Sequence, residues 1–284
     1  MTTPRTPSIY HATLLRAGSF RLDGGGMFGL VPKTMWSKLA VPDERNRIPL
    51  QTNCLLLRDG VRTVLVETGF GDKWSDKERE LYSLERRTVV DALAEIGVAP
   101  TEITHVIVTH LHFDHAAGLT RAGGDESILP TFENADVFVQ RLEWEDALAN
   151  KSTMSRTYLR THLDPIAERV RLLDGEASPL PGISVEPVPG HTWGQQMVRF
   201  STQSGPCGFA GDVMPTRNHA GLAFNMAYDM LPYENLLTKR RLLGRAAAEG
   251  WRLILDHEPG HPIVSVRSEA TDRWAVESAD LGEA

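Results

Sequence analysis

Short apolar runs separated by turn residues recur along the chain, and they predict β-strands in both of its halves. Near the start, strands are expected over residues 11–16 and 19–22. The apolar runs 54–57 and 63–66 flank Asp59-Gly60, an arrangement typical of a β-hairpin. Further buried strands are predicted over residues 106–108, 137–139, 170–173, 183–188, 197–200, 207–210 and 253–255.

Helical periodicity separates several of these strands. Apolar residues recur three and four positions apart from Val89 to Ile96, and Gly97 directly after them predicts the end of an amphipathic helix. Further helices are expected over residues 142–149 and from Pro232 to Glu249. Because strands and helices mix in both halves, we expect an α/β fold with layered sheets and helices outside them.

No repeat or low-complexity linker divides the 284 residues, so we expect one domain over residues 1–284. Residues 23–49 contain three consecutive glycines and three prolines, and they are predicted to form a long irregular loop. This loop is expected to cover the active site, to form the contact of a possible homodimer, or both. No helix is expected to begin at Asp23, and no Gly-Lys-Ser/Thr follows the glycines, so a phosphate-binding loop is excluded.

Composition and charge narrow the class of partner. Apolar residues make up 41% and charged residues 24% of the chain, which is ordinary for a globular protein. The net charge of −7 argues against nucleic acid and favours a small-molecule substrate. No apolar run reaches the ~20 residues that cross a bilayer and no secretory signal is recognisable, so we expect a cytoplasmic protein without membrane contact. Cys54 and Cys207 are expected to be buried thiols.

The sharpest chemical signal is the run Thr109-His110-Leu111-His112-Phe113-Asp114-His115, which directly follows a predicted buried strand. Four metal-binding side chains fall within six residues, and they include three of the chain's ten histidines. Imidazole and carboxylate together suit zinc, with manganese, iron or cobalt as alternatives. Three further candidates each follow a predicted strand, namely His191, Asp212 and His257.

These motifs resemble those of the metallo-β-lactamase superfamily. Its His-x-His-x-Asp-His signature is matched by His110 to His115, and Gly190-His191, Gly211-Asp212 and Asp256-His257 follow in the family order. The resemblance spans roughly residues 52–262 and implies a four-layer αβ/βα sandwich. It also implies that two divalent metal ions are bound by seven ligands: His110, His112 and His191 on the first ion, Asp114, His115 and His257 on the second, and Asp212 on both.

The resemblance further implies hydrolysis by a metal-activated water, in which Asp114 and Asp212 take part as ligands at the reacting centre. Two dications, two carboxylates and one hydroxide leave about one net positive charge in the site, so the site is expected to bind anionic products favourably. His257 is preferred to His261 as the last ligand because it directly follows the apolar strand. His105 is expected to be a packed or edge histidine outside the ligand set.

We expect an apolar, aromatic-lined pocket beside the metals, and Phe28, Trp193, Phe224 and Tyr228 are its candidate substrate-binding residues. The leading hypothesis is therefore a hydrolase of a lactone or carboxylic ester. A phosphoester, organophosphate or thioester hydrolase with the same fold is the first alternative. An iron-dependent oxidoreductase is the alternative from another class of function, and a binding protein without catalysis is a third possibility.

Overall fold

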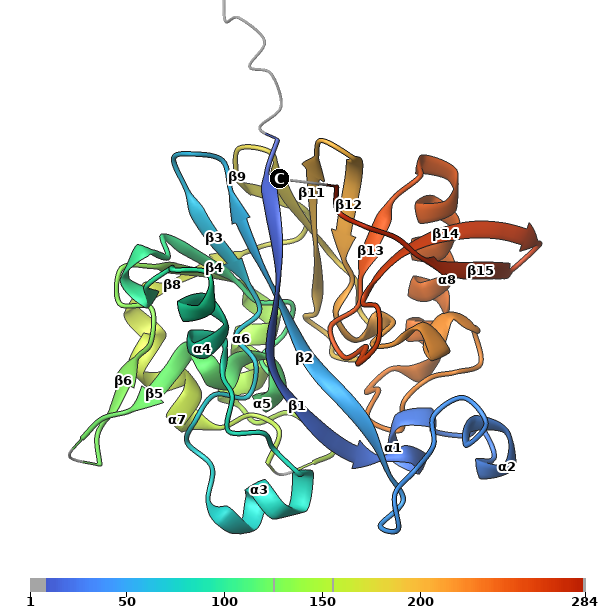
Figure 1. Cartoon of the computed structure of the whole chain (residues 1–284), viewed down its shortest axis with the longest axis horizontal. Helices are drawn as coiled ribbons and strands as arrows, with labels where there is room; N and C mark the ends of the chain where they lie inside the picture. The colour runs from blue at the N-terminus through green and yellow to red at the C-terminus, as the bar shows by residue number, and fades with distance from the viewer. Residues whose placement is uncertain (1–8, 125, 155, 283–284) are drawn as a thin grey trace, which may run out of the picture.

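A computed structural model describes residues 9–124, 126–154 and 156–282, which fold into a four-layer αβ/βα sandwich (Figure 1). Within these ranges, the first sheet contains six strands in the order β1 (His11–Asp23), β2 (Arg47–Arg58), β3 (Thr63–Val66), β4 (His105–Ile107), β7 (Asp136–Gln140) and β8 (Val170–Leu173). The second sheet contains seven strands over the same described ranges. Their order is β15 (Arg273–Ser278), β14 (Ile263–Ala270), β13 (Arg252–Ile254), β12 (Gly205–Phe209), β11 (Gln196–Thr202), β10 (Ile183–Pro187) and β9 (Ala177–Leu180).

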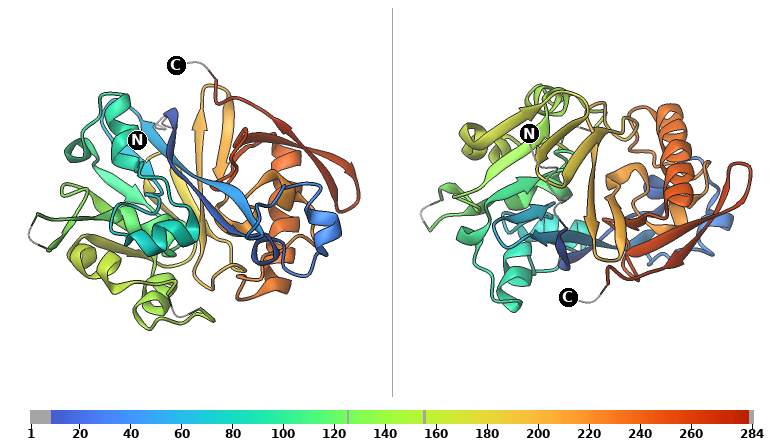
Figure 2. Two further views of the ribbon diagram at one scale, coloured as in Figure 1. Left: turned by 60° about the horizontal axis from the view of Figure 1, so that its bottom comes forward. Right: turned by 90° about the horizontal axis from the view of Figure 1, so that it is seen from above.

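The helices lie mainly outside the two sheets, with α4 and α6 on the side of the first sheet and α8 on the side of the second (Figures 1 and 2). A small hairpin of β5 (Thr120–Ala122) and β6 (Ile128–Pro130) projects from the first half. The helices are α1 (Gly24–Phe28), α2 (Lys33–Trp36), α3 (Asp76–Tyr82), α4 (Val89–Glu95), α5 (Phe113–Ala116), α6 (Arg141–Leu148), α7 (Arg160–Leu163) and α8 (Pro232–Glu249). Short 3₁₀ turns cover Pro100–Glu102, Ala117–Leu119, Asp164–Arg169, Gly211–Val213 and Arg217–Ala220.

Strand β2 shows why its apolar run is continuous. Successive side chains of a strand point to opposite faces, and both faces of this sheet are covered. Cys54 and Leu56 pack toward α4 and α6, whereas Leu55 and Leu57 pack into the core between the two sheets. A third core joins α8 to the outer face of the second sheet. Three apolar layers thus hold the four structural layers together.

Two sets of parallel strands bring functional loops to one region. Strands β3, β4, β7 and β8 pair in parallel, and so do β12 and β13 in the other sheet. The ends of parallel neighbours lie at the same edge of a sheet, so the loops after β3 and β4 meet, as do those after β12 and β13. Six of the seven predicted ligands follow β4, β12 or β13, and the seventh, His191, lies between β10 and β11.

The segment 23–49 is more ordered than the sequence predicted. The expectation that no helix begins at Asp23 is wrong, because the Asp23 carboxylate accepts a hydrogen bond from the backbone N–H of Gly26 at 2.9 Å and caps α1. Helix α2 follows, and β2 already begins at Arg47. The sequence did not predict this helix because three consecutive glycines follow Asp23, and glycine disfavours helices. Two of them are needed, however, since a Cβ on Gly24 would lie 2.4 Å from the Trp36 ring and one on Gly26 would lie 2.0 Å from the Tyr228 hydroxyl.

The other predicted strands and helices agree with the structure to within about two residues at most ends, and the hairpin at Asp59-Gly60 is confirmed. Cys54 and Cys207 are free and buried, as expected. Strands β14 and β15 were missed because their outer halves are exposed and rich in charged residues. Every helix in the described ranges is too short or too polar to span a bilayer.

Candidate metal centre

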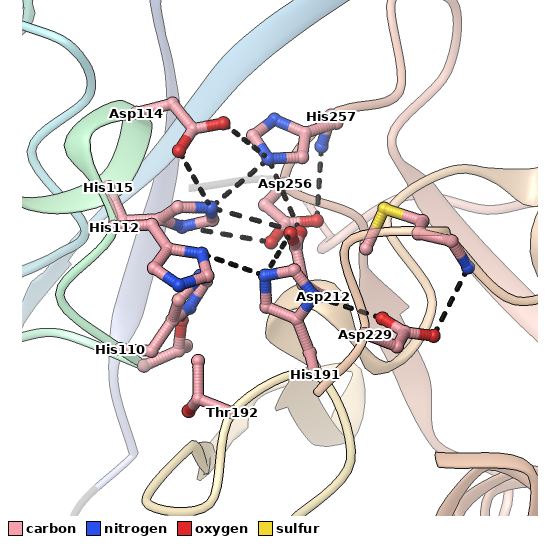
Figure 3. Close-up of polar contacts among 12 residues, drawn as sticks. His110, His112, Asp114, His115, His191, Thr192, Asp212, Asp229, Asp256 and His257 are labelled. Atoms are coloured by element: carbon pink, nitrogen blue, oxygen red, sulfur yellow. Dashed lines mark hydrogen bonds and ion pairs between the residues drawn. The ribbon is translucent and has the colours of Figure 1, made fainter. Parts of the chain in front are cut away.

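The first group of candidate ligands consists of His110, His112 and His191, all buried, with ligand nitrogens within 4.8 Å of one another. His110 and His112 follow β4, and His191 lies between β10 and β11 (Figure 3). The Nε2 atom of His191 is 2.9 Å from Nδ1 of His112. The opposite edge of the His191 ring is held by Asp229, whose Oδ1 lies 3.0 Å from Nδ1.

The chemistry of this first group fits a cation. Burial, reinforced by the neighbouring histidines, lowers the pKa of His110 and His112 well below the usual value, so both imidazoles are neutral. Their Nε2 atoms are buried without a hydrogen-bond partner among the described residues. Buried polar atoms are rarely left unpaired, and neutral imidazole nitrogens are good zinc ligands.

The second group contains His115 and His257, whose Nε2 atoms face each other at 3.1 Å. Both rings are fixed from behind, because Nδ1 of His115 is 3.1 Å from the Glu67 carboxylate and Nδ1 of His257 is 3.0 Å from the carbonyl oxygen of Gln51. These partners accept hydrogen bonds, so each Nδ1 carries the proton and each Nε2 keeps a lone pair. Two facing lone pairs repel each other, and either a proton or a metal ion between them removes that repulsion.

Carboxylates surround these two histidines. Burial alone would lower the pKa of His115, but Asp114, Glu67 and Asp212 outweigh it and raise that pKa to about 9. For His257, Asp212 and Asp256 likewise outweigh burial and raise the pKa well above its usual value. This second group therefore attracts positive charge strongly, whether a proton or a metal ion supplies it.

Asp212 lies between the two groups. Its Oδ2 is 3.1 Å from Nε2 of His191 in the first group, and its Oδ1 is 3.3 Å from Nε2 of His257 in the second. Asp114 lies at the second group only, 3.5 Å from Nε2 of His257 and 3.8 Å from Nε2 of His115. The structure thus brings all seven predicted ligands together, while His105 lies apart beside Thr104 and Phe138.

Three buried acidic residues around the site were not predicted as functional. Asp229 holds His191, and Glu143 accepts hydrogen bonds from Thr192, Tyr158 and the backbone of Leu111. Asp256 groups with His115, Asp212 and His257, and its Oδ2 has no hydrogen-bond partner among the described residues. Asp256 could have been noticed, because it directly precedes His257, whereas no local pattern marks Asp229 or Glu143.

These acids change the charge expected in the site. Glu67 and Asp256 lie 3.1 and 3.9 Å from Nδ1 of His115, and Asp229 lies against His191. Burial, with Asp212 close by, raises the pKa of Asp256 well above its usual value. Counting the carboxylates of Glu67 and Asp229 with the two ligand carboxylates changes the net charge inferred from the sequence from about +1 to about −1. A preference for anionic products is therefore not supported.

A cavity of about 200 Å³ opens onto both groups of ligands. Its wall is largely apolar, and its floor is formed by candidate ligands. The lining residues other than ligands are Leu22, Met27, Tyr82, Phe113, Met154, Thr157, Met226 and Tyr228.

Only one of the four predicted substrate-binding residues, Tyr228, lies along this cavity among the described residues. Phe28 is fully buried and stacks on both Trp36 and His219, and Phe224 packs edge-on against it. Trp193 lies elsewhere, with the Lys151 ammonium 4.0 Å from its ring centre. Closeness to a metal-binding motif in the sequence did not predict where these side chains point. Each aromatic ring packs against the neighbours of its own loop, which the motif does not specify.

Comparison of the sequence with known families finds one match over most of the chain. The model described as the metallo-β-lactamase superfamily matches residues 47–257. The N-acyl homoserine lactonase of Bacillus thuringiensis is 30% identical over 161 residues, which cover 53% of this chain and 58% of that protein. The chain thus spans less than two thirds of the length of the lactonases it matches.

Solved structures give longer matches. A probable metal-dependent hydrolase from Staphylococcus aureus has a TM-score of 0.86 at 28% identity, covering 96% of this chain and 99% of that one. AidC, a dizinc quorum-quenching lactonase in complex with a product, has a TM-score of 0.79 at 16% identity, covering 97% and 96% of the two chains. At that identity, the second match supports the fold and no more.

Proposed function

Because the chain belongs to the metallo-β-lactamase superfamily, we propose that it is a metal-dependent hydrolase of lactones or carboxylic esters with two divalent ions. The observation that carries this proposal is the apolar cavity whose floor consists of candidate ligands from both groups, among them His112, Asp114, His191, Asp212 and His257. Such a cavity holds an apolar group of the substrate and presents the adjoining carbonyl to the metal centre.

In this proposal His110, His112 and His191 hold one ion, Asp114, His115 and His257 the other, and Asp212 binds both. The unpaired buried nitrogens of His110 and His112 and the facing lone pairs of His115 and His257 support that division. Zinc suits this mixture of imidazole and carboxylate best. Divalent ions bound here would lower the pKa of a coordinated water and polarise the substrate carbonyl.

The remaining residues of the cavity bind and orient the substrate. Apart from the ligands, none of the described lining residues carries a formal charge. This favours an uncharged acyl or alkyl group over the anionic phosphate of a phosphomonoester. Burial raises the pKa of Tyr228 and of Tyr82, so both phenols stay protonated at neutral pH and can donate a hydrogen bond to a carbonyl oxygen.

A lactone is preferred to an open ester because curated relatives are named N-acyl homoserine lactonases. Those proteins therefore suggest the first substrates to try. Residues 1–284 are proposed to act as one domain, since the core between the sheets draws side chains from both halves of the chain.

The test combines elemental analysis with a panel of substrates. Protein purified without added metal is analysed for bound metals and assayed on lactones, carboxylic esters, thioesters and phosphoesters with matched acyl chains. We expect about two zinc-like ions per chain, with hydrolysis of lactones or esters that a chelator abolishes. Bound iron with oxygen consumption and no hydrolysis would contradict the proposal, and so would hydrolysis of phosphoesters alone.

A further inference from the structure

Residues 224–231, named the wall loop below, form one side of the cavity and lead directly into α8. The wall loop contributes Met226 and Tyr228 to the lining of the cavity. Its far end is bonded to the segment that carries a candidate metal ligand. The backbone N–H of Met230 donates to the carbonyl of His191 at 3.0 Å, and that of Leu231 donates to the carbonyl of Gly190 at 2.8 Å.

Asp229 adds a side-chain link between this loop and the metal centre. Its side chain is fully buried, and its Oδ1 accepts a hydrogen bond from Nδ1 of His191 at 3.0 Å (Figure 3). Its Oδ2 accepts two more, from the backbone N–H of Met226 at 3.1 Å and from Nδ2 of Asn235 at 2.8 Å. One carboxylate therefore contacts a candidate metal ligand on one side and a residue of the cavity wall on the other.

Helix α8 anchors the other end of the wall loop independently of the metal centre. The buried ammonium of Lys239 donates to the carbonyl of Phe224 at 2.8 Å and to the side chain of Asn225 at 3.2 Å. Next to Met226, the backbone N–H of Ala227 donates to the carbonyl of Gly26 at 2.8 Å. Among these supports, Asp229 is the one that contacts the imidazole ring of a candidate metal ligand and also bonds directly to Met226.

We infer that Asp229 is a positioning residue that couples occupancy of the first metal site to the shape of the substrate cavity. This inference builds on the proposed function, since it assigns His191 to a metal. By accepting from Nδ1–H, Asp229 directs the Nε2 lone pair of His191 toward the ion. The ion in turn fixes His191 and, through Asp229, the backbone of Met226. Release of the metal is expected to make the wall loop more mobile. Conversely, a substrate bound against Met226 is expected to raise the affinity of the first site for its metal.

The direct test is hydrogen exchange of the zinc-loaded and chelator-treated protein, followed by mass spectrometry. We expect removal of zinc to speed amide exchange in residues 224–231 on the order of tenfold or more. Residues 76–82 serve as the internal control, because Tyr82 also lines the cavity but no hydrogen bond of this segment reaches a candidate ligand histidine within the described ranges. An equal response of both segments, or no response, would overturn the coupling.

Asp229→Asn tests the same link from the protein side. An amide has one oxygen and one donor nitrogen, so in either orientation its nitrogen faces groups that donate to Asp229, namely His191 on one side or Met226 and Asn235 on the other. We expect zinc affinity at the first site to fall ~10–100-fold. We also expect rapid exchange in residues 224–231 with or without zinc, and a shifted visible absorption band of the cobalt-loaded protein.

Asn235→Ala is the matched control, because it removes one partner of Oδ2 and leaves the contact with His191 intact. Its zinc affinity should stay within about twofold of the wild type, with an unchanged cobalt spectrum. Wild-type zinc affinity and spectrum in folded Asp229→Asn would refute the inference. Hydrogen exchange, metal affinity and absorption are measured without substrate turnover. The test therefore remains informative even if the protein hydrolyses none of the proposed substrates.

Discussion

The two groups of candidate ligands differ in how many carboxylates surround their histidines, although they share one cavity. The first group, His110, His112 and His191, consists of imidazoles, and two of its rings are kept neutral by burial. The second group pairs His115 and His257 with several carboxylates, which raise the pKa of both histidines. In the first group, His110 and His112 thus offer lone pairs without competition from protons at neutral pH, whereas Asp212 and Asp229 raise the pKa of His191. In the second group, a metal must displace protons from both histidines.

This difference indicates that the two sites load differently. Zinc should enter the second group less readily as pH falls, because the pKa of both of its histidines is raised, whereas in the first group only the pKa of His191 is raised. Each group also has its own buried acidic residue that orients one of its histidines. Asp229 orients a ligand of the first group, and Glu67 orients a ligand of the second.

The largest expected effect comes from removing a ligand of the first group. His112→Ala should abolish metal binding at that site and lower kcat/KM by ~10³-fold or more, because a bound ion contributes several kcal/mol to the transition state. The fold should survive, since His112 belongs to none of the four apolar cores. His105→Ala, on the preceding strand, is the control and should keep nearly full activity and metal content. Full turnover by His112→Ala would refute the assignment.

The second group is tested through Glu67, whose carboxylate contacts Nδ1 of His115 and accepts from the backbone N–H of Thr109 at 2.5 Å. Glu67→Gln should weaken metal binding at the second group by ~10–100-fold and leave the first group unchanged. Metal titration of the metal-free protein by calorimetry measures both. A uniform loss at both sites would mean that the two groups do not behave as separate sites.

A smaller effect is expected from the cavity wall. A Cβ on Gly26 would lie 2.0 Å from the Tyr228 hydroxyl, so Gly26→Ala should displace that ring. We expect KM for the best ester or lactone to rise severalfold, roughly the ~1 kcal/mol of a lost contact, with unchanged metal content. Gly25→Ala is the control, since its nearest neighbour is the Asp23 carboxylate at 2.9 Å. Equal kinetics of the two variants would show that the position of the Tyr228 ring does not affect substrate binding.

The smallest effect on activity is expected from substituting a buried histidine that lies outside both groups of ligands. This substitution should, however, change the pH dependence of stability measurably. Burial lowers the pKa of His219 to about 4, and its Nε2 donates to the carbonyl of Met27 while Nδ1 accepts from Thr216. The unfolded chain takes up this proton at a pH near 6.5. Stability from the neutral ring is therefore complete above pH 6.5 and is lost as pH falls toward 4.

His219→Gln cannot take up this proton. Between pH 6.5 and 5 it should lose less free energy of unfolding than the wild type, by on the order of 1–2 kcal/mol. Urea denaturation of the metal-free proteins at several pH values gives the comparison. Parallel pH profiles would show that the ring is not held neutral.

The ligand set was predictable because its signal is local. Four candidate ligands lie within six residues, and the other three follow strands with apolar patterns. Order in the chain then matched a known family. Layers and sheets were predictable for a related reason, since alternating and helical periodicities are properties of neighbouring residues.

The cavity wall and the supporting acids could not be found in this way. Tyr228 lines the cavity while Phe224, four residues before it, packs against Phe28, and nothing in the local sequence separates the two. Asp229 acquires its role from His191, which lies 38 residues away. Such contacts are fixed by the meeting of distant loops, and a single sequence does not record which loops meet.

The division of the chain between the sheets has a consequence for assembly. Apart from the hairpin of β5 and β6, strands up to β8 (Val170–Leu173) form the first sheet, and strands from β9 (Ala177–Leu180) onward form the second. The signature from His110 to His115 belongs to the first half, whereas His191, Asp212 and His257 belong to the second. Each metal site would therefore take ligands from both halves. Two polypeptides separated near Gly175 and produced independently should associate as a heterodimer whose affinity rises with the concentration of free zinc.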